Sequence, residues 1–598
     1  MGTPHKQARR LTPLGRKRTL AGRKLGGHMN SQTPIYTERT ECQDCFKCIR
    51  ECPVKAIKVE NACAAVIPDL CILCGHCVEI CPNGAKHVRD DLKRARLLLA
   101  EKEQVYASLA PSFVSEFPDI PAAAVIGALK KLGFKGVSET ALGAELVSGS
   151  AARLLQDRTP RVIVSTACPV VVNYIGKYYS QYVNCLMPRV SPVLAHCQML
   201  RETYGPGIGI VFFSPCIGKK QEADSNPHML DVALTFEDMR RWMAAEGLVF
   251  ETGSSGSESF VPHSASEGGL YPVDGGMVAG VKANCSIMEA DCMAFSGIRN
   301  IRKAIMGLNE IRLSHPVFLE LLACEGGCVN GPKASQRHAT AWKRCQIIDY
   351  AKYPGNEIPR PLEAPQSAGL APDPVPAREY NDKIMKQALQ SVGKYGPEDE
   401  LNCGGCGYDN CREFAKALID GKAEKVMCVS YMRKLAQKKA NALMEKVPSA
   451  IVLVDEEIRL IECNMNFARL LGPDVETAFR RKPGLEGVLL REVAPFHSLF
   501  KMVLEKDEDM LSRDLRYKKS VLHVDIFSIE KNRVVCGIFQ DITKPTVHKE
   551  AMIQKAQEVI KKNLETVQQI AYLLGENAAE SEVILNSIIQ AVTTQEVE

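Results

Sequence analysis

Two cysteine runs, "CQDCFKCIRECP" and "CILCGHCVEICP", constrain this chain more than any other feature; they begin at Cys42 and Cys71. Both have the spacing C-x2-C-x2-C-x3-C-P. Three thiolates this close together can wrap one face of a four-iron cubane, whereas a zinc site needs neither the duplication nor the prolines. This part of the chain is therefore expected to fold around metal rather than around a large apolar core.

The doubled pattern is typical of bacterial ferredoxins, in which the fourth cysteine of each run binds the cluster of the other run. We expect a ferredoxin-like module with two 4Fe-4S clusters over residues 31–92. The predicted ligands are Cys42, Cys45, Cys48 and Cys81 for one cluster, and Cys71, Cys74, Cys77 and Cys52 for the other.

The length and the use of cysteine predict a multidomain protein of a reducing compartment. At 598 residues the chain is too long for one core, and most of its 24 cysteines are clustered rather than spread for disulfide pairing. No apolar run is long enough to span a membrane or to form the core of a signal peptide. A cytoplasmic location, with no membrane partner, is the resulting expectation.

The net charge of +5 comes from a basic leader over residues 1–30. Its first 27 residues carry eight Lys or Arg and no Asp or Glu, so the rest of the chain is net negative. Such a leader could be an arm for nucleic acid or a transit peptide. A disordered extension or an expression tag is favoured, because the cysteine motifs begin only after Met29, and no nucleic-acid partner is expected.

Between residues 93 and 353, strand-like runs alternate with helical segments. The runs "QVYASLA", "RVIVST", "GIGIVFFS" and "HPVFLELLA" each lead into a polar or Gly/Pro-bearing loop, which is typical of an α/β domain. Seven prolines between Pro354 and Pro376 then predict a linker over 354–380, or an extended wrap on the surface.

A second cysteine-rich segment, here called the CGGC module, covers residues 381–440. It contains Cys403, Cys406, Cys411 and Cys428 in the spacing C-x2-C-x4-C-x16-C. Four thiolates suit either zinc or a 4Fe-4S cluster. The segment "CGGCGYDNC" resembles the small iron-sulfur module of corrinoid and electron-transport proteins. This resemblance implies a third 4Fe-4S cluster, and a zinc site is the alternative.

Four further cysteines follow strand-like runs of the α/β segment. They are Cys168 in "STACPV", Cys216 in "SPCIGKK", and Cys324 and Cys328 in "ACEGGCVNGP". The carboxyl ends of strands in an open α/β sheet line one crevice, so these thiols can converge to hold one cubane. Buried, unreactive thiols are expected at Cys185, Cys197, Cys285, Cys292, Cys345, Cys463 and Cys536.

The motifs "TACP", "SPCIGKK" and "FLELLACEGGCVNG" resemble, in order and spacing, the three signature loops of the FeFe-hydrogenase family, and the resemblance covers about residues 37–345. It implies an H-cluster, in which a 4Fe-4S cubane is joined to a diiron subcluster with CO, cyanide and an azadithiolate bridge. By this resemblance Cys328 would bridge the two parts, Lys219 would contact a cyanide, and Pro215 would shape the pocket. The implied partners are H2, protons and an electron carrier such as ferredoxin.

The departures from the family pattern concern protons and the diiron pocket. Active members carry a proton-relaying cysteine where this chain has Ala167, and alanine cannot carry a proton. They carry methionine at the positions of Ser214 and Leu322, and a glycine at that of Pro332. The acids expected just after Glu145 are replaced by "LVSGSA". Slow turnover is the expected consequence.

The last part of the chain reads as a small α+β domain over 446–545 and a helix over 546–598. The phrases "AIVLVDEEIRLIECNMNFARLLG" and "GIFQDIT" resemble a PAS domain, which implies sensing or dimerisation. The helix carries an apolar stripe typical of helix packing in one chain or a homodimer, formed by Ile553, Ala556, Ile560, Leu564, Val567, Ala571 and Leu574.

Three hypotheses follow. The favoured one is a sensory FeFe-hydrogenase, in which slow H2 chemistry sets the state of the clusters and the PAS-like domain passes it to a signalling partner. The second is a catalytic, ferredoxin-linked hydrogenase with another proton route. The third is a non-enzymatic iron-sulfur scaffold, which retention of Lys219 and Cys328 disfavours.

Overall fold

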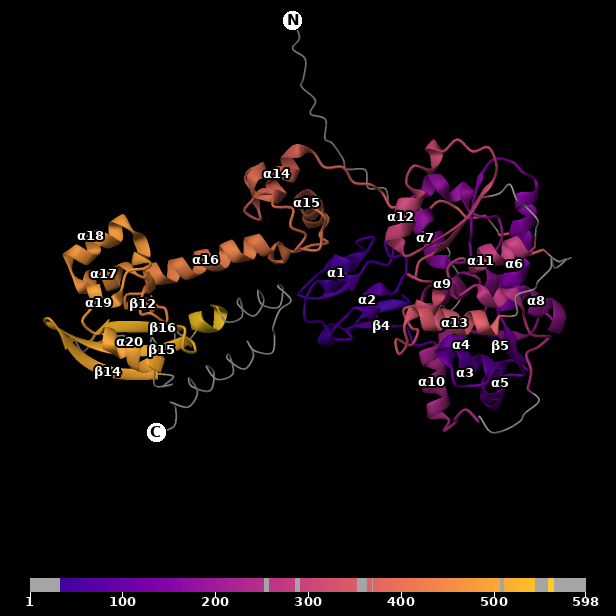
Figure 1. Ribbon diagram of the computed structural model, residues 1–598, viewed down its shortest axis with the longest axis horizontal. Coiled ribbons are helices and arrows are strands. Elements are labelled where there is room, and N and C mark those ends of the chain that lie inside the picture. The colour runs from indigo at the N-terminus through magenta and orange to yellow at the C-terminus, as the bar shows by residue number, and fades with distance from the viewer. Residues whose placement is uncertain are drawn as a thin grey trace, which may run out of the picture.

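The computed structural model describes residues 33–251, 258–284, 291–351, 363–367, 369–505, 510–543 and 558–563. Figure 1 shows that the spatial order of its parts differs from their order in the sequence. The ferredoxin-like module lies between the α/β domain and the CGGC module, and one long helix, α16 (Val429–Lys446), leads from the CGGC module to the C-terminal domain. In space, the two cysteine modules therefore lie between the α/β domain and the C-terminal domain.

The ferredoxin-like module repeats one backbone pattern twice. Strands β1 (Ile35–Thr37) and β4 (Lys86–Val88) pair antiparallel, as do β2 (Ile57–Val59) and β3 (Ala64–Val66). Each cysteine run turns through two left-handed residues before a short helix. These are Asp44 and Phe46 before α1 (Lys47–Glu51), and Leu73 and Gly75 before α2 (His76–Glu79). The duplication seen in the sequence is thus also present in the backbone.

The α/β domain contains two parallel sheets. One has the order β6-β5-β8-β9 and the other β10-β11-β7. The single open sheet expected from the sequence is therefore wrong, since the strands that precede Cys168 and Cys324 belong to one sheet and the strand that precedes Cys216 to the other. The strands are β5 (Val105–Leu109), β6 (Gly136–Glu139), β7 (Val162–Val164), β8 (Gly209–Ser214), β9 (Val232–Thr235), β10 (Asp291–Ser296) and β11 (Val317–Leu322).

Helices cover these sheets, and the apolar cores lie between sheet and helix. Strand β8 is buried along its whole length, as is usual for a parallel strand with both faces covered. The helices are α3 (Leu92–Glu101), α4 (Phe113–Glu116), α5 (Ala122–Lys131), α6 (Ala141–Gln156), α7 (Pro169–Tyr178), α8 (Pro192–Tyr204), α9 (Gly218–Ser225), α10 (Phe236–Ala245), α11 (Gly276–Ala283), α12 (Ile298–Ile305) and α13 (Thr340–Tyr350).

The described part of the proline-rich segment is a surface wrap, the second of the two alternatives. The Val190 amide donates to the carbonyl of Pro365 over 3.1 Å. Further along, the Val375 amide donates to the carbonyl of Lys177 over 3.0 Å. Backbone hydrogen bonds therefore hold this segment along the α/β domain on its way to the CGGC module.

The CGGC module is helical, and the C-terminal domain is α+β as predicted. Its antiparallel sheet has the order β13-β12-β16-β15-β14. The remaining elements are α14 (Asp382–Gln390), α15 (Cys411–Ile419), β12 (Ala450–Val454), β13 (Leu460–Cys463), α17 (Met465–Leu471), α18 (Pro473–Arg481), α19 (Leu490–Val493), α20 (His497–Glu505), β14 (Met510–Tyr517), β15 (Ser520–Glu530) and β16 (Val534–Asp541).

Two predicted segments fall largely outside the described residues. Of the helix expected over 546–598, residues 558–563 are helical. The leader and Cys285 lie outside the described ranges. Among the described helices, none has the length and apolarity required to cross a bilayer.

Candidate metal centre and electron-transfer sites

Three loops that leave parallel strands carry the four cysteines predicted to share a cubane. Cys168 immediately precedes α7, and Cys216 lies between β8 and α9. Cys324 and Cys328 follow β11. The charges of Cys168 and Cys216 both act on Cys328, so cysteines that follow strands of different sheets come together.

The four thiols occupy one buried region. Burial raises the pKa of Cys216 to about 11, and the Cys168 charge raises it further. Burial also raises the pKa values of Cys324 and Cys328 well above the ordinary range, and the other three thiols of the group contribute to the rise at Cys324. Thiols in such surroundings stay protonated unless a metal displaces the proton. The donor set therefore fits a thiolate-bound iron-sulfur cluster.

Zinc and a cubane place different demands on the thiols. All ligands of a zinc ion bind one atom. In a cubane each thiolate binds a different iron. Within the described ranges, no three His, Cys, Asp or Glu side chains lie around one possible ion position.

Glycines shape the loop between Cys324 and Cys328. Gly326 and Gly327 have φ values of +77° and +100°, in the left-handed region. A Cβ at Gly327 would collide with the carbonyl oxygen of Pro272. The Gly326 amide donates to Ser296 Oγ over 3.1 Å, which fixes the loop against the end of β10. The two glycines of the sequence "CEGGC" thus allow both thiols to face the same region.

Lys219 reaches this region from α9 and is almost fully buried. Its Nζ donates to Ser191 Oγ over 3.2 Å and to the carbonyl of Ala167 over 3.4 Å. Glu222 Oε2 lies 2.5 Å from the same nitrogen. The ammonium is therefore positioned beside Ala167, where the sequence predicts that a proton relay is lost. Glu222 was not predicted from the sequence, although its place three residues after Lys219 on a helix is a usable signal.

The residues next to Cys216 have structural contacts of their own. The Cys216 amide donates to Ser214 Oγ over 3.3 Å, so this serine turns the loop in a way that methionine could not. The carbonyl of Pro215 accepts a 3.1 Å hydrogen bond from the Lys333 amide. A Cβ at Gly331 would lie 3.0 Å from Pro215 Cβ, so this proline packs against the third signature loop.

Leu322 and Pro332 pack on either side of that loop. Leu322 is buried in the apolar cluster that contains Cys168. Pro332 lies against Gly75 of the ferredoxin-like module, where a Cβ would come within 2.5 Å of the proline ring. The substitution at position 332 thus forms a contact between the α/β domain and the loop of Cys74 and Cys77.

A group of buried acids near Tyr271 was not predicted from the sequence. Glu145, Glu267 and Glu320 are each 4% exposed or less, and their charges all act on the half-buried Tyr271. Tyr271 Oη lies 3.0 Å from Ser148 Oγ. These groups come from separate elements, so no local pattern in the sequence reveals them.

Glu320 is the acid of this group that acts on Cys328. Its carboxylate accepts from the amides of Gly275 over 3.1 Å and Val278 over 2.9 Å, at the start of α11. Burial nevertheless raises the pKa of Glu320 to about 7, because desolvation outweighs these hydrogen bonds. A group with this pKa can exchange a proton near neutral pH.

In the ferredoxin-like module the thiols form two spatial groups. Burial raises the pKa of Cys48 to about 12, and the charges of Cys45, Cys42 and Cys81 add to the rise. This group is the set assigned to one cluster from the sequence. The buried Lys86 partly offsets these thiolate charges, and its Nζ donates to Thr37 Oγ1 over 2.6 Å.

The second spatial group contains the other predicted set of thiols. Burial raises the pKa of Cys77 well above its ordinary value, and the charges of Cys74, Cys71 and Cys52 contribute to the rise. The Cys74 charge also reaches Cys324. This set therefore lies nearest to the four thiols of the α/β domain.

The CGGC module also gathers its thiols. Burial raises the pKa of Cys406 to about 11, with the charges of Cys428 and Cys403 as further causes. Cys411 opens α15, and its amide donates to Asn402 Oδ1 over 2.8 Å. Four thiols from one short module are again a donor set that fits a cluster.

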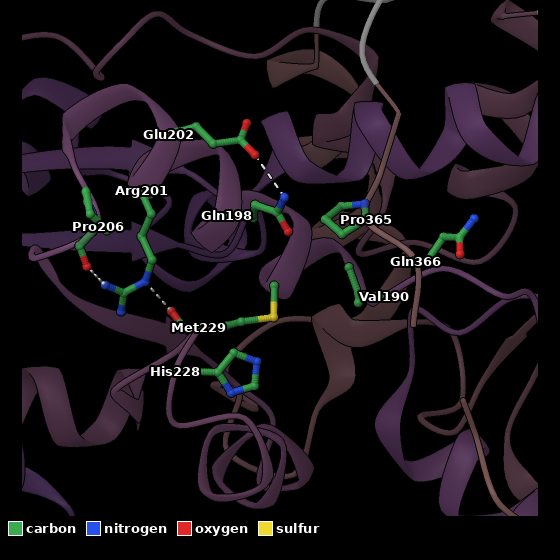
Figure 2. A pocket seen from close by; sticks show the side chains of 9 residues that line it. All are labelled: Val190, Gln198, Arg201, Glu202, Pro206, His228, Met229, Pro365 and Gln366. Atoms are coloured by element: carbon green, nitrogen blue, oxygen red, sulfur yellow. Dashed lines mark hydrogen bonds between the residues drawn. The ribbon is translucent and has the colours of Figure 1, made fainter. Parts of the chain in front are cut away.

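An open pocket of about 420 Å³ lies elsewhere on the α/β domain, and Figure 2 shows its lining. None of the predicted site residues lines it. The Arg201 guanidinium donates to the carbonyls of Pro206 and Met229, as Figure 2 shows, and to Asp231. Its charged group is therefore used within the fold, and the pocket offers little chemistry for a ligand.

Comparison with known proteins gives three family matches. The family described as "Iron only hydrogenase large subunit, C-terminal domain" matches residues 103–332. A 4Fe-4S binding domain matches residues 64–87, and an Fe-S cluster family matches residues 399–430. Each match falls on one of the three cysteine-bearing regions described above.

Individual relatives are distant. The chain is 22% identical over 411 residues to "NADP-reducing hydrogenase subunit HndD" of Solidesulfovibrio fructosivorans, over 55% of this chain and 70% of that protein. It is 23% identical over 284 residues to "Iron hydrogenase 1" of Clostridium pasteurianum, over 39% of this chain and 49% of that protein. It thus spans about half the length of the second relative. A solved structure of a variant of FeFe-hydrogenase HydA1 from Chlamydomonas reinhardtii is 18% identical, covers 44% of this chain and 88% of that chain, and gives a TM-score of 0.36.

Proposed function

From the premise that the chain belongs to the FeFe-hydrogenase family, we propose that it is a slow, sensory hydrogenase that converts the presence of H2 into the redox state of its clusters. It is a hydrogenase-like iron-sulfur protein with an H-cluster-type domain. The finer proposal is that turnover is low and that the C-terminal domain receives the signal.

In this proposal each part of the site has one role. When bound, the diiron group would supply the reversible interconversion of H2 with protons and electrons. Cys168, Cys216, Cys324 and Cys328 would hold the cubane, and Cys328 would also bridge to the diiron group. The Lys219 ammonium would hold an anionic ligand of that group, as a buried point charge with several donors can.

The observation that carries the proposal is the side chain at position 167. The Ala167 carbonyl lies 3.4 Å from Lys219 Nζ, so this residue stands beside the group that would face the diiron centre. Its methyl group can neither accept nor donate a proton. The metal-binding residues are therefore present while the nearest step of proton transfer is absent, which suits detection better than bulk turnover.

Infrared spectroscopy of the matured full chain tests this function. We expect CO and cyanide bands under argon that shift reversibly under H2, together with weak turnover. An absence of these bands would contradict both hydrogenase hypotheses and support the iron-sulfur scaffold. Bands accompanied by H2 evolution at rates usual for the family would favour the catalytic alternative instead.

The variant Ala167→Cys is expected to raise H2 turnover about tenfold, which corresponds to about 1.4 kcal/mol of barrier. A thiol at this position restores one proton-transfer group, but the altered residues at Ser214 and after Glu145 remain. Turnover is measured with a redox dye as acceptor. Ala167→Ser is the control, since its hydroxyl has similar size and a poor pKa for relay. No gain over the serine variant would place the limiting step elsewhere.

The buried acids give the catalytic alternative a specific observation. Glu320 has a pKa near 7 and acts on Cys328, and Glu145, Glu267 and Tyr271 lie in the same buried group. A second proton route on this side would combine Glu320 on β11 and Glu267 with Glu145, which lies on the same helix, α6, as "LVSGSA". Family-typical rates in the unmodified chain would favour that reading over the sensor.

A PAS-type role of the C-terminal domain is part of the proposal. Its centre is filled by Phe467, Phe496, Phe500 and Phe539, and the rings of Phe496 and Phe539 lie 4.6 Å apart. These side chains occupy the centre of the domain. The proposed output is a signalling partner or a homodimer rather than a ligand bound inside the domain.

A further inference from the structure

The CGGC module and the ferredoxin-like module share one apolar core. Phe46, Ile49 and Val59 of the ferredoxin-like module pack in the same buried cluster as Phe414 and Met427 of the CGGC module. Predicted cluster ligands from both modules border this core, namely Cys42, Cys48 and Cys52 on one side and Cys406 and Cys428 on the other. The two modules are therefore joined next to their metal sites.

A glycine permits the closest approach between the modules. Gly407 directly follows the ligand Cys406 and has φ of +91°. A Cβ at this position would lie 3.1 Å from the Arg50 amide nitrogen and 3.2 Å from Ile49 Cγ2. Arg50 and Ile49 lie on α1, between the ligands Cys48 and Cys52. The loop that carries Cys406 thus lies directly against the helix that carries ligands of both ferredoxin-type clusters.

Two further contacts fix the arrangement. The Val59 amide donates to the carbonyl of Lys422 over 3.0 Å, so strand β2 is bonded to the CGGC module. The ring of Tyr408 is buried next to Gly407, and the charges of both Cys406 and Cys52 act on its hydroxyl. The Tyr408 side chain therefore lies between ligands of two different predicted clusters.

The outer end of the CGGC module leads directly into α16. Cys428 is the residue before this helix, and its carbonyl accepts a 2.9 Å hydrogen bond from the Met432 amide in the first turn. Helix α16 has 18 residues, so it is about 27 Å long. Its far end is tied to the C-terminal domain by a 2.9 Å hydrogen bond from Asn466 Nδ2 to the carbonyl of Val447.

We infer that the Gly407–α1 contact is an electron-transfer junction, and that the CGGC cluster is the terminal acceptor whose redox state is presented to the C-terminal domain through Cys428 and α16. This inference rests on the proposed function for the source of the electrons. The proposed order begins at the four thiols of the α/β domain and passes to the Cys74 set, the Cys48 set and the CGGC module. Figure 1 shows these modules lying in the same order.

The step across the junction is a one-electron exchange. One reduced ferredoxin-type cluster returns from the 1+ to the 2+ state, and the CGGC cluster passes from 2+ to 1+. The net charge of the CGGC cluster with its four thiolates then becomes one unit more negative at the start of α16. No proton or further reactant is needed for the exchange.

Electron paramagnetic resonance of the full chain, reconstituted with iron and sulfide and reduced with dithionite, tests the junction. We expect magnetic interaction between the CGGC cluster and a ferredoxin-type cluster, seen as line broadening. The variant Gly407→Leu should lose this broadening because its side chain collides with α1. Gly404→Leu is the matched control: Gly404 also has positive φ, +70°, in the same loop, and a Cβ there would lie 3.8 Å from the carbonyl oxygen of Tyr408, the nearest atom outside the adjoining residues.

If the Gly407→Leu chain fails to bind the CGGC cluster, a second variant tests the junction. Cys403→Ala removes a ligand at the exposed edge of the CGGC module, and the signals of the ferredoxin-type clusters should then become narrower. Unchanged signals in this variant, or broadening retained in a cluster-loaded Gly407→Leu chain, would overturn the junction. Because dithionite supplies the electrons, the junction is tested independently of H2. Broadening in the reconstituted chain, combined with no response of the separately matured chain to H2, would refute the proposed function and leave the junction intact.

Discussion

Replacing Cys328 with alanine should abolish the CO and cyanide bands of the matured protein and reduce H2 turnover to background. Cys328 is predicted both to bind the cubane and to bridge to the diiron group, so its loss removes two bonds that no neighbouring side chain can replace. The thiols that act on it, Cys168 and Cys216, already belong to the same donor set. Infrared bands and hydrogen consumption are the measurements.

Cys185→Ala is the matched control for this variant. Cys185 is half-buried in the same domain, and burial alone raises its pKa, with no neighbouring thiol among the causes. Its bands and turnover should equal those of the unmodified chain. In both variants the clusters of the ferredoxin-like and CGGC modules should remain. Persistence of the bands in Cys328→Ala would contradict the assigned bridge.

The candidate cluster-binding cysteines could be found in the sequence because cluster motifs place their cysteines at short, characteristic spacings. The ligand sets of the two ferredoxin-type clusters follow from the doubled run, and the thiols that act on Cys48 and on Cys77 are those of the predicted sets. The strands before Cys168, Cys216 and Cys324 were also visible as apolar runs. These signals are local, so one sequence suffices to find them.

Features that depend on long-range packing were not predictable. The strands before Cys168 and Cys216 belong to different sheets, and periodicity carries no information about which strands pair. Glu267 and Glu320 meet Tyr271 only because η3 (Glu267–Leu270), β11 and α6 pack together. The docking of Gly407 on α1 joins segments more than 350 residues apart in sequence, and nothing near either segment indicates it.

The buried acids change the interpretation of the alanine at position 167. From the sequence, the proton route is lost and no replacement is visible. The structure adds a buried group of acids, in which Glu320 acts on Cys328 and Glu145 lies on α6, immediately before the positions expected to supply the acids. The missing relay therefore removes one route at one position, and Ala167→Cys measures how much of the barrier that position sets.

The variant Gly143→Ala should destabilise the α/β domain by about 3 kcal/mol or more, at the upper end of the usual cost of overpacking. Gly143 lies where α6 crosses α8. A Cβ there would lie 2.7 Å from His196 Cβ and would collide with the carbonyl oxygen of Pro192. Backbone atoms cannot rotate away, so α8 must shift, and with it Ser191, which holds Lys219 Nζ.

Calorimetry of the matured full chain measures this effect as the midpoint of the transition of the α/β domain, which should fall by about 10 °C for a domain of this size. Gly127→Ala on α5 is the control, because nothing lies within 4 Å of its added Cβ. That variant should be stabilised by up to about 1 kcal/mol through helix propensity. Opposite signs from the same chemical change would show that the contact between α6 and α8, and not the loss of glycine, sets the position of Ser191 and Lys219. Equal midpoints for both variants would contradict the tight crossing.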